Sequence, residues 1–87
     1  MGKPPEREDL RRAVGETVRS LRHKAGMAQE RLALQAGLDR TYMSALERGR
    51  YSPTIETIYK LLPQLGCSFT QFARAFERIL AAGNKNR

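Results

Sequence analysis

The stretch DRTYMSALERG, residues 39–49, combines guanidinium, hydroxyl and methyl groups at helical spacing. At about 100° per residue, with Arg40 at zero, Met43 and Leu46 fall near about 300° and about 240°, so we expect both to face a core. The other face, from about 0° to about 140°, is small or basic. We expect the following residues to be exposed on it: Arg40, Thr41, Ser44, Ala45 and Arg48.

An exposed helix face of this composition suits the major groove of duplex DNA. Arginine pairs there bidentately with guanine, and the methyl group of threonine or alanine contacts that of thymine. Asp39 is a good N-cap for this helix, and free N–H groups at the helix start can hold a phosphate. Alternatively, Arg40 is a solvated charge beside Asp39. Thr41 and Ser44 could simply be small enough to enter the groove, and Tyr42 is expected to pack with its hydroxyl outward.

The segment before this helix has the pattern of its supporting partner. Met27 and Leu32 have the spacing of a hydrophobic staple if Ala28 is the N-cap. Gln29 then lies exposed in the first turn, where its amide could hold a backbone phosphate. Small residues let the two helices approach closely across a tight turn, as a helix-turn-helix requires. These are Ala33, Ala36 and Gly37, and Leu38 can fill the angle after them.

Apolar residues recur at helical spacing along most of the chain. The pattern predicts five helices: one of about four turns from Leu10 that Gly26 stops, a short one around Leu32 that ends at Gly37, one between Asp39 and Gly49, one from Thr54 to Gly66, and one that Ser68 caps and that ends before Gly83. No segment alternates with the period of a strand. We predict an all-α fold, a compact bundle of five helices. One helix-turn-helix domain over residues 9–82 would carry a disordered tail at 1–8 and another at 83–87.

Size and charge restrict the class of protein. A chain of 87 residues forms one small domain, too short for a separate sensor or catalytic domain. The 16 Lys and Arg residues against 9 Asp and Glu give a formal net charge of +7, which favours a polyanionic binding partner such as nucleic acid or an acidic membrane.

The single cysteine, Cys67, is expected to be a small buried hydrophobe in a reducing compartment. Without a signal peptide or membrane span, we expect a cytoplasmic protein that does not bind membranes.

The sequence offers no chemistry of an enzyme. It contains no nucleophile–base pair, carboxylate pair, metal cluster or phosphate loop, so we expect no catalysis, no cofactor and no metal. His23 is expected on the surface. The arginines of the first predicted helix are expected to be solvated, although Arg19 or Arg22 could add a phosphate contact: Arg11, Arg12, Arg19 and Arg22.

Residues 26–72 strongly resemble the helix-turn-helix family of phage repressors and Cro, the XRE type, whose fold is that of lambda repressor. The residues in register are the glycines, Gln29, Leu32, Ala33, Ala36, Leu38, Leu46, Glu47, Gly49, Pro53 and Leu65. The run LDRTYMS followed by LERG and a fifth helix is also similar to the controller proteins of restriction-modification genes.

The resemblance implies a role for each matching position. Gln29 would contact phosphate and steady the recognition helix, and Glu47 would tie that helix to its neighbours. The residues that would read bases are Arg40, Thr41, Ser44 and Ala45. Those that would meet the sugar-phosphate backbone are Arg48, Arg50, Tyr51 and Ser52.

Two residues depart from the family pattern. Ala28 stands where Ser or Thr usually caps the second helix, a loss of about 1 kcal/mol. Pro63 lies inside the fourth predicted helix, where a proline costs about 3 kcal/mol unless the helix ends or kinks. We therefore predict a kink or break over residues 62–64, which would alter the packing of the fifth helix.

The fifth predicted helix carries an apolar stripe that we expect to form a dimer interface. Its residues are Phe69, Phe72, Phe76, Ile79 and Leu80. The alternative is that this stripe closes the core of the monomer. In a symmetric dimer two recognition helices would meet successive major grooves about 34 Å apart, so the operator would be pseudo-palindromic.

The predicted function is a homodimeric, sequence-specific DNA-binding transcriptional regulator, controlled by its own concentration through autoregulation. Bound over a promoter it would exclude RNA polymerase, and bound upstream it could recruit it. One alternative is an antitoxin of the same fold, which would bind a toxin protein as well as its promoter. Another is a protein-interaction module, which the small and basic face at residues 40–44 argues against.

Overall fold

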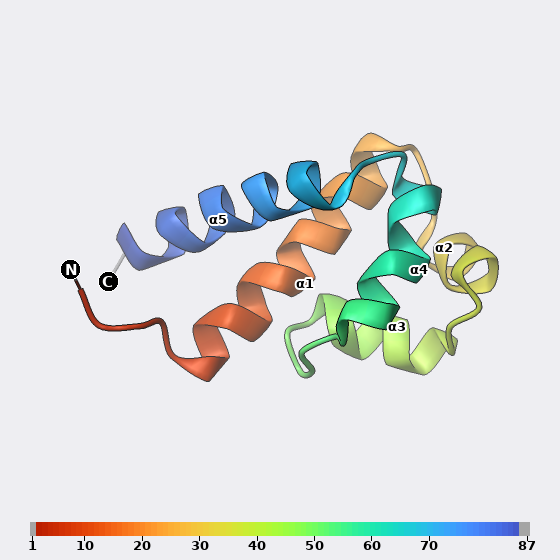
Figure 1. Cartoon of the computed structure of the whole chain (residues 1–87). Coiled ribbons are helices and arrows are strands. Elements are labelled where there is room, and N and C mark those ends of the chain that lie inside the picture. Colours follow the sequence, from red (N-terminus) through yellow and green to blue (C-terminus); the bar gives the residue numbers. More distant parts are fainter. Residues whose placement is uncertain (1, 86–87) are drawn as a thin grey trace.

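The computed structural model of the chain describes the backbone of residues 2–85 and the side chains of residues 2–83. It contains five helices (Figure 1): α1 Arg7–Lys24, α2 Gln29–Ala36, α3 Arg40–Glu47, α4 Ile55–Leu65 and α5 Phe69–Lys85. No strand occurs within residues 2–85, and no helix there is both long and apolar enough to cross a membrane. The predicted all-α fold of five helices is confirmed.

The two long helices, α1 and α5, pack against each other, and α2, α3 and α4 gather at one end of the pair (Figure 1). The Cα trace extends 39 × 23 × 21 Å. α1 also contacts α2 and α3, whereas α5 packs mainly on α1. α1 therefore connects the helix-turn-helix to the carboxyl-terminal helix.

The core contains apolar side chains from all five helices. Those with no exposed surface are Val18, Leu32, Met43, Leu46 and Leu61, and Phe72 of α5 is 3% exposed. Burial of a side chain of this size contributes about 1.5–3 kcal/mol. Because Met43 and Leu46 are fully buried, the core fixes the rotation of α3 about its axis.

Both terminal helices extend beyond their predicted ends. α1 begins at Arg7, inside the tail predicted over residues 1–8, with Glu6 as its N-cap. Asp9 supports this start, because its Oδ2 accepts the Glu6 N–H at 3.3 Å. α5 continues to Lys85, into the tail predicted over 83–87, of which residues 86–87 lie outside the described part. The apolar pattern missed these turns because their residues are polar or small.

Hydroxyl side chains begin the last two helices. Ser68 Oγ accepts the Gln71 N–H at 3.1 Å, and Gln71 Oε1 accepts the Ser68 N–H at 2.8 Å, which confirms the predicted cap of α5. Thr54 Oγ1 accepts the Thr57 N–H at 3.1 Å and begins α4 in the same way. α2 starts after Ala28, which has no side-chain oxygen, as the sequence predicted.

Pro63 does not interrupt α4, so the predicted break over residues 62–64 is wrong. The helix is continuous from Ile55 to Leu65 (Figure 1). Pro63 lies in the last turn, where its missing N–H removes a single helical hydrogen bond and little helix remains to be displaced. Gly66, with φ 68° and ψ 34°, then ends the helix, and its N–H donates to the Pro63 carbonyl oxygen at 3.3 Å.

Cys67 follows this helix end and packs, half-buried, against the core. Burial raises the pKa of the Cys67 thiol above its usual value. The thiol is therefore protonated at neutral pH and behaves as the small hydrophobe that the sequence predicted.

α1 and α3 touch through their backbones at Gly15. A Cβ atom on Gly15 would lie 2.5 Å from the carbonyl oxygen of Leu46 and 2.9 Å from that of Glu47. These oxygens belong to the end of α3 and cannot rotate away as a side chain could. Glycine at position 15 therefore sets how closely α3 can approach α1.

Replacement of Gly15 by alanine should lower the free energy of unfolding by about 1–3 kcal/mol, because the methyl group overpacks this contact. Alanine is more favourable than glycine in a helix by roughly 1 kcal/mol, and this gain offsets only part of the cost of overpacking. Urea denaturation followed by circular dichroism measures the change. Ser20→Ala, at an exposed site of the same helix, is the control and should not destabilise. An unchanged midpoint for Gly15→Ala would contradict the close contact.

Candidate nucleic-acid interface

A tight turn joins α2 to α3 and sets the angle between them. Gly37 adopts the left-handed conformation, with φ 70° and ψ 33°, which glycine reaches without steric cost. The Leu38 N–H then donates to the Ala33 carbonyl oxygen at 2.8 Å. The Leu38 side chain is half-buried against the core, in the position predicted for it. The predicted helix-turn-helix geometry is thus present over α2 and α3.

The outer face of α3 agrees with its predicted composition at four of five positions, including Arg48 just after the helix. Arg40 and Thr41 are exposed, Ser44 is partly exposed, and the buried face carries Met43 and Leu46. A guanidinium and two hydroxyls therefore lie together at the start of the helix, on the side away from the core.

Ala45 corrects this prediction, because it is buried, with 6% of its surface exposed. The chain after α3 folds back over it, and the Arg50 N–H donates to the Ala45 carbonyl oxygen at 3.0 Å. This return brings the ring of Tyr51 onto that of Tyr42, with 5.8 Å between ring centres. Ala45 forms part of a hollow between these two tyrosines, Asp39 and Thr41. Tyr42 is half-buried, in agreement with its predicted packing.

Asp39 caps α3 as predicted, and this changes the role expected for the helix start. Its Oδ1 accepts the N–H of Thr41 at 2.6 Å and that of Tyr42 at 3.4 Å. These two N–H groups are therefore occupied by a carboxylate, and the predicted phosphate contact at this helix start stays a prediction for the N–H groups that Asp39 does not cap.

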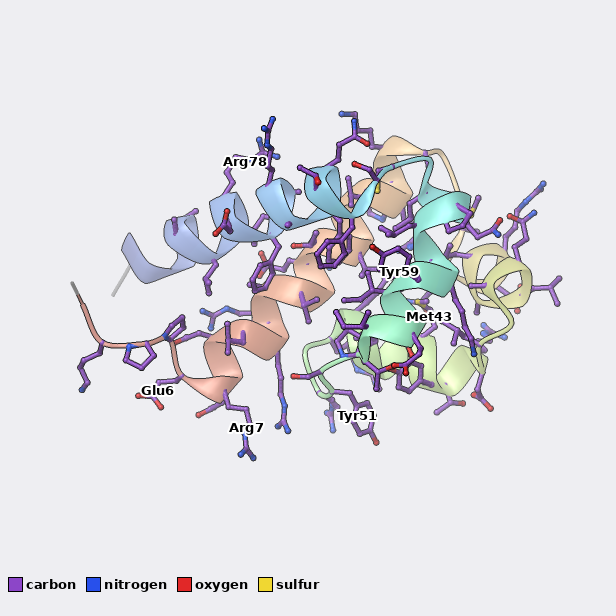
Figure 2. All side chains as sticks on the ribbon, in the orientation of Figure 1. Glu6, Arg7, Met43, Tyr51, Tyr59 and Arg78 are labelled. Carbon is purple, nitrogen blue, oxygen red and sulfur yellow. The ribbon has the colours of Figure 1, made fainter. Side chains whose placement is uncertain are left out.

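The loop after α3 carries the predicted phosphate-binding residues on its surface. All four side chains are exposed: Arg48, Arg50, Tyr51 and Ser52. Arg48 Nη1 donates to Ser44 Oγ within α3, so the Ser44 hydroxyl has a partner on its own helix. Figure 2 shows Tyr51 beside α3 and Arg78 on the opposite side of the molecule, above α5.

A buried polar network holds the end of α3 to both neighbouring helices. Arg22 of α1 donates twice to Glu47, from Nε to Oε2 at 2.8 Å and from Nη2 to Oε1 at 2.9 Å. Its Nη1 also donates to the Met27 carbonyl oxygen at 2.8 Å. Gln29 Nε2 of α2 donates to Glu47 Oε1 at 3.0 Å. Glu47 therefore ties α3 to α1 and α2, as the resemblance implied.

Arg22 corrects the expectation that the arginines of α1 are solvated. It is 8% exposed, because its side chain follows Val14 and Val18 at four-residue spacing on the buried stripe. This spacing was available in the sequence and could have identified it. Gln29 is half-buried rather than exposed, since its amide is directed to Glu47.

The stripe predicted as a dimer interface is not uniform. Phe72 is in the monomer core, so its predicted place in the interface is wrong, and Phe76 packs against that core. Ile79 and Leu80 are half-buried, in a hollow shared with α1. Phe69 is 37% exposed. The reason is that α5 packs on α1, so Phe72 closes the monomer, whereas the other four residues keep part of their surface exposed.

Comparison with known proteins identifies the family. A family model described as Helix-turn-helix matches residues 18–72. The uncharacterized HTH-type transcriptional regulator y4dJ of Sinorhizobium fredii is 40% identical over 63 residues, 72% of this chain and 82% of that protein. The control protein C.BamHI of Bacillus amyloliquefaciens is 39% identical over 59 residues, 67% of this chain and 73% of that protein.

A solved structure has the same fold. It is the restriction-modification controller protein C.Esp1396I, a tetramer in complex with its natural 35 base-pair operator. The TM-score is 0.76 at 30% identity, over 83% of this chain and 95% of that chain. Together with the α2–α3 geometry, these matches show that the chain belongs to the helix-turn-helix family of the phage repressor and Cro, or XRE, type.

Proposed function

We propose that the protein is a sequence-specific DNA-binding transcriptional regulator that acts as a homodimer on a pseudo-palindromic operator. The observation that carries the proposal is the outer face of α3. Arg40 and Thr41 are exposed there, while the network at Glu47 fixes the helix from behind. A rigid helix with an exposed guanidinium and hydroxyl is suited to reading base edges in the major groove.

Base reading is assigned to the start of α3. Arg40 would donate two hydrogen bonds to a guanine, and Thr41 would contact a neighbouring base through its hydroxyl or methyl group. Ser44 can join them once its hydroxyl leaves Arg48. Ala45 is left out of the readout, because only 6% of its surface is exposed.

Phosphate binding is assigned to residues on either side of this face. Arg48 and Arg50 supply positive charge, and Tyr51 and Ser52 supply hydroxyl donors next to them. Gln29 would complete the set at the start of α2, where Ala28 leaves the first N–H groups without a side-chain cap. Contacts of this kind orient the protein on DNA without reading its sequence.

The dimer interface is proposed at the exposed apolar surface between α4 and α5. Ile55 is 57% exposed, Tyr59 is 55% exposed, and the ring of Tyr59 stacks on Phe69 with 5.7 Å between ring centres. Phe69 and Phe76 also line an apolar hollow of about 280 Å³. A second copy of the chain would cover these rings, and the tetrameric assembly of C.Esp1396I supports self-association.

We propose that the dimer, bound to its operator, regulates transcription of its own gene. An operator that overlaps the promoter of the protein's own gene would let its concentration set its expression, by blocking or recruiting RNA polymerase. The relatives are named as a transcriptional regulator, a control protein and a restriction-modification controller protein, which supports this role over that of an antitoxin.

Selection of random duplex DNA on the purified protein tests the proposal. At about 150 mM salt, non-specific attraction to phosphates is weakened, so enrichment reports base recognition. We expect an inverted repeat with half-sites one helical turn apart. Recovery of unenriched DNA, bound only at low salt, would contradict the proposal.

Replacement of Arg40 by alanine should cost about 1–3 kcal/mol of binding free energy and relax selection at one position of each half-site. Competition titrations with single-base variants of the selected operator measure both effects. Arg78→Ala is the matched control, since it removes the same charge from the side of the molecule away from α3 (Figure 2). Equal losses of binding free energy for the two variants would show that Arg40 does not read a base.

A further inference from the structure

Arg40 has a partner that the proposed readout does not use. Its Nη1 lies 2.7 Å from Oε2 of Glu30, a residue of the first turn of α2. The two side chains are 73% and 68% exposed. An ion pair so exposed contributes little to folding stability. The position of the pair, between the supporting helix and the reading helix, therefore calls for another explanation.

The ion pair with Glu30 leaves most N–H donors of Arg40 available for a base. The ion pair joins a single terminal nitrogen of Arg40 to a single oxygen of Glu30. A guanidinium carries five N–H donors in one plane, so its other edge can still donate to O6 and N7 of a guanine. Glu30 can thus hold one side of the plane while the base takes the other.

The ion pair with Glu30 lowers the conformational entropy of the Arg40 side chain before it binds DNA. A long arginine side chain has many rotamers, and only some of them present the plane edge-on to a base. A carboxylate partner selects among these rotamers before DNA arrives, so less conformational entropy is lost for a correct base.

The charge of Glu30 also weakens binding to incorrect sequences. Glu30 directly follows Gln29, which is assigned to phosphate. If Arg40 left Glu30, the carboxylate would be uncompensated and would repel the DNA backbone. While Arg40 stays on Glu30, the guanidinium is not free to move onto a phosphate of an unrelated sequence. Non-specific binding is weakened, and binding to the right guanine is retained.

We propose that Glu30 is a positioning residue that sets sequence specificity by holding Arg40 in the orientation required for guanine. The inference rests on the proposed DNA-reading function and adds a residue to it that does not itself touch a base. It predicts that the base facing Arg40 in each half-site is a guanine and that Glu30 strengthens its selection.

The test compares the wild-type protein with Glu30→Gln, which keeps the size of the side chain and removes its charge. Affinities are measured at about 150 mM salt for three duplexes: the selected operator, the operator with the Arg40-facing guanine replaced in both half-sites, and a scrambled duplex. We expect Glu30→Gln to lower the ratio of the first affinity to the second by about 5-fold, with stronger binding to scrambled DNA and an unchanged melting temperature.

Two comparisons separate positioning from a general charge effect. Glu16→Gln makes the same change of net charge at an exposed residue of α1 that forms no ion pair among the described residues, and it should leave the ratio unchanged. In an Arg40→Ala background, Glu30→Gln should no longer affect the ratio, because the group that it positions is absent.

The possible failures can be distinguished. If the wild-type protein binds all three duplexes equally, the proposed function and this inference both fall. If the wild type discriminates and Glu30→Gln discriminates equally well, only the role of Glu30 is overturned. An equal loss of discrimination in Glu16→Gln would also overturn it, as would an effect of Glu30→Gln that persists without Arg40.

Discussion

Replacement of Glu47 by alanine is expected to lower the free energy of unfolding by about 3–5 kcal/mol, since removal of one partner leaves the other charge buried and unpaired. The remaining charge is the guanidinium of Arg22, which is 8% exposed and would keep only the Met27 carbonyl oxygen among its main partners. A small domain has a total stability of about 5–15 kcal/mol, so this single substitution should remove a large fraction of it.

Thermal and urea denaturation followed by circular dichroism measure this loss. Glu56→Ala, at an exposed position of α4, is the control and should change stability by less than about 0.5 kcal/mol. The double variant Arg22→Met with Glu47→Leu removes both charges and should recover most of the loss, because apolar replacements of a buried pair are often tolerated. A loss below about 1 kcal/mol in Glu47→Ala would mean that water reaches the pair.

Replacement of Phe69 by glutamate is expected to convert the dimer to monomers and to weaken binding to the full operator by about 100-fold or more. A dimer places its second recognition helix at a high effective concentration, and this advantage is typically about 10²–10⁴-fold. Phe69 is the appropriate position because it is 37% exposed, whereas the same change at Phe72 would place a charge in the core.

Sedimentation gives the assembly state, and titrations with full and single half-sites give the affinities. Binding to a single half-site should change little in Phe69→Glu, since the reading face of α3 is untouched. Thr70→Glu introduces the same charge at the neighbouring exposed residue of α5 and should remain dimeric. Persistence of the Phe69→Glu dimer would place the interface on another face of the molecule.

The sequence predicts what local pattern and turn chemistry determine. The burial of Met43 and Leu46 follows from their spacing, and the exposure of Arg40 follows from the same rotation. The caps at Asp39 and Ser68 follow from side chains that accept N–H groups at a helix start. These are interactions between residues close in the chain, so one sequence is enough to predict them.

The errors concern contacts between distant segments or the position of a residue within its element. Ala45 is buried by a loop that returns after α3, and α5 packs on α1 so that Phe72 faces inward. The burial of Arg22 follows from its four-residue spacing after Val18, but its charge partner lies 25 residues away and cannot be identified from spacing within one helix. Pro63 was misjudged because its effect depends on how many residues of α4 follow it.

The ion pair between Glu30 and Arg40 was missed for a related reason. Arg40 was predicted as a reading position of its helix and Glu30 was not singled out, because their contact depends on the angle that the turn at Gly37 creates. Helical periodicity gives the face of each residue within its own helix, but it does not give the angle between two helices.

The backbone contact at Gly15 has a consequence for operator spacing. Because α3 lies directly against α1 and α1 carries α5, no compressible layer of side chains separates the reading helix from the carboxyl-terminal half of the domain at this point. Two domains joined through α4 and α5 would form a rigid dimer with a fixed distance and angle between the two α3 helices. One base pair added between the half-sites turns the second half-site by about a tenth of a helical turn. A rigid dimer could contact both half-sites then only by bending the DNA. Spacer length would then be selected as strictly as the bases themselves.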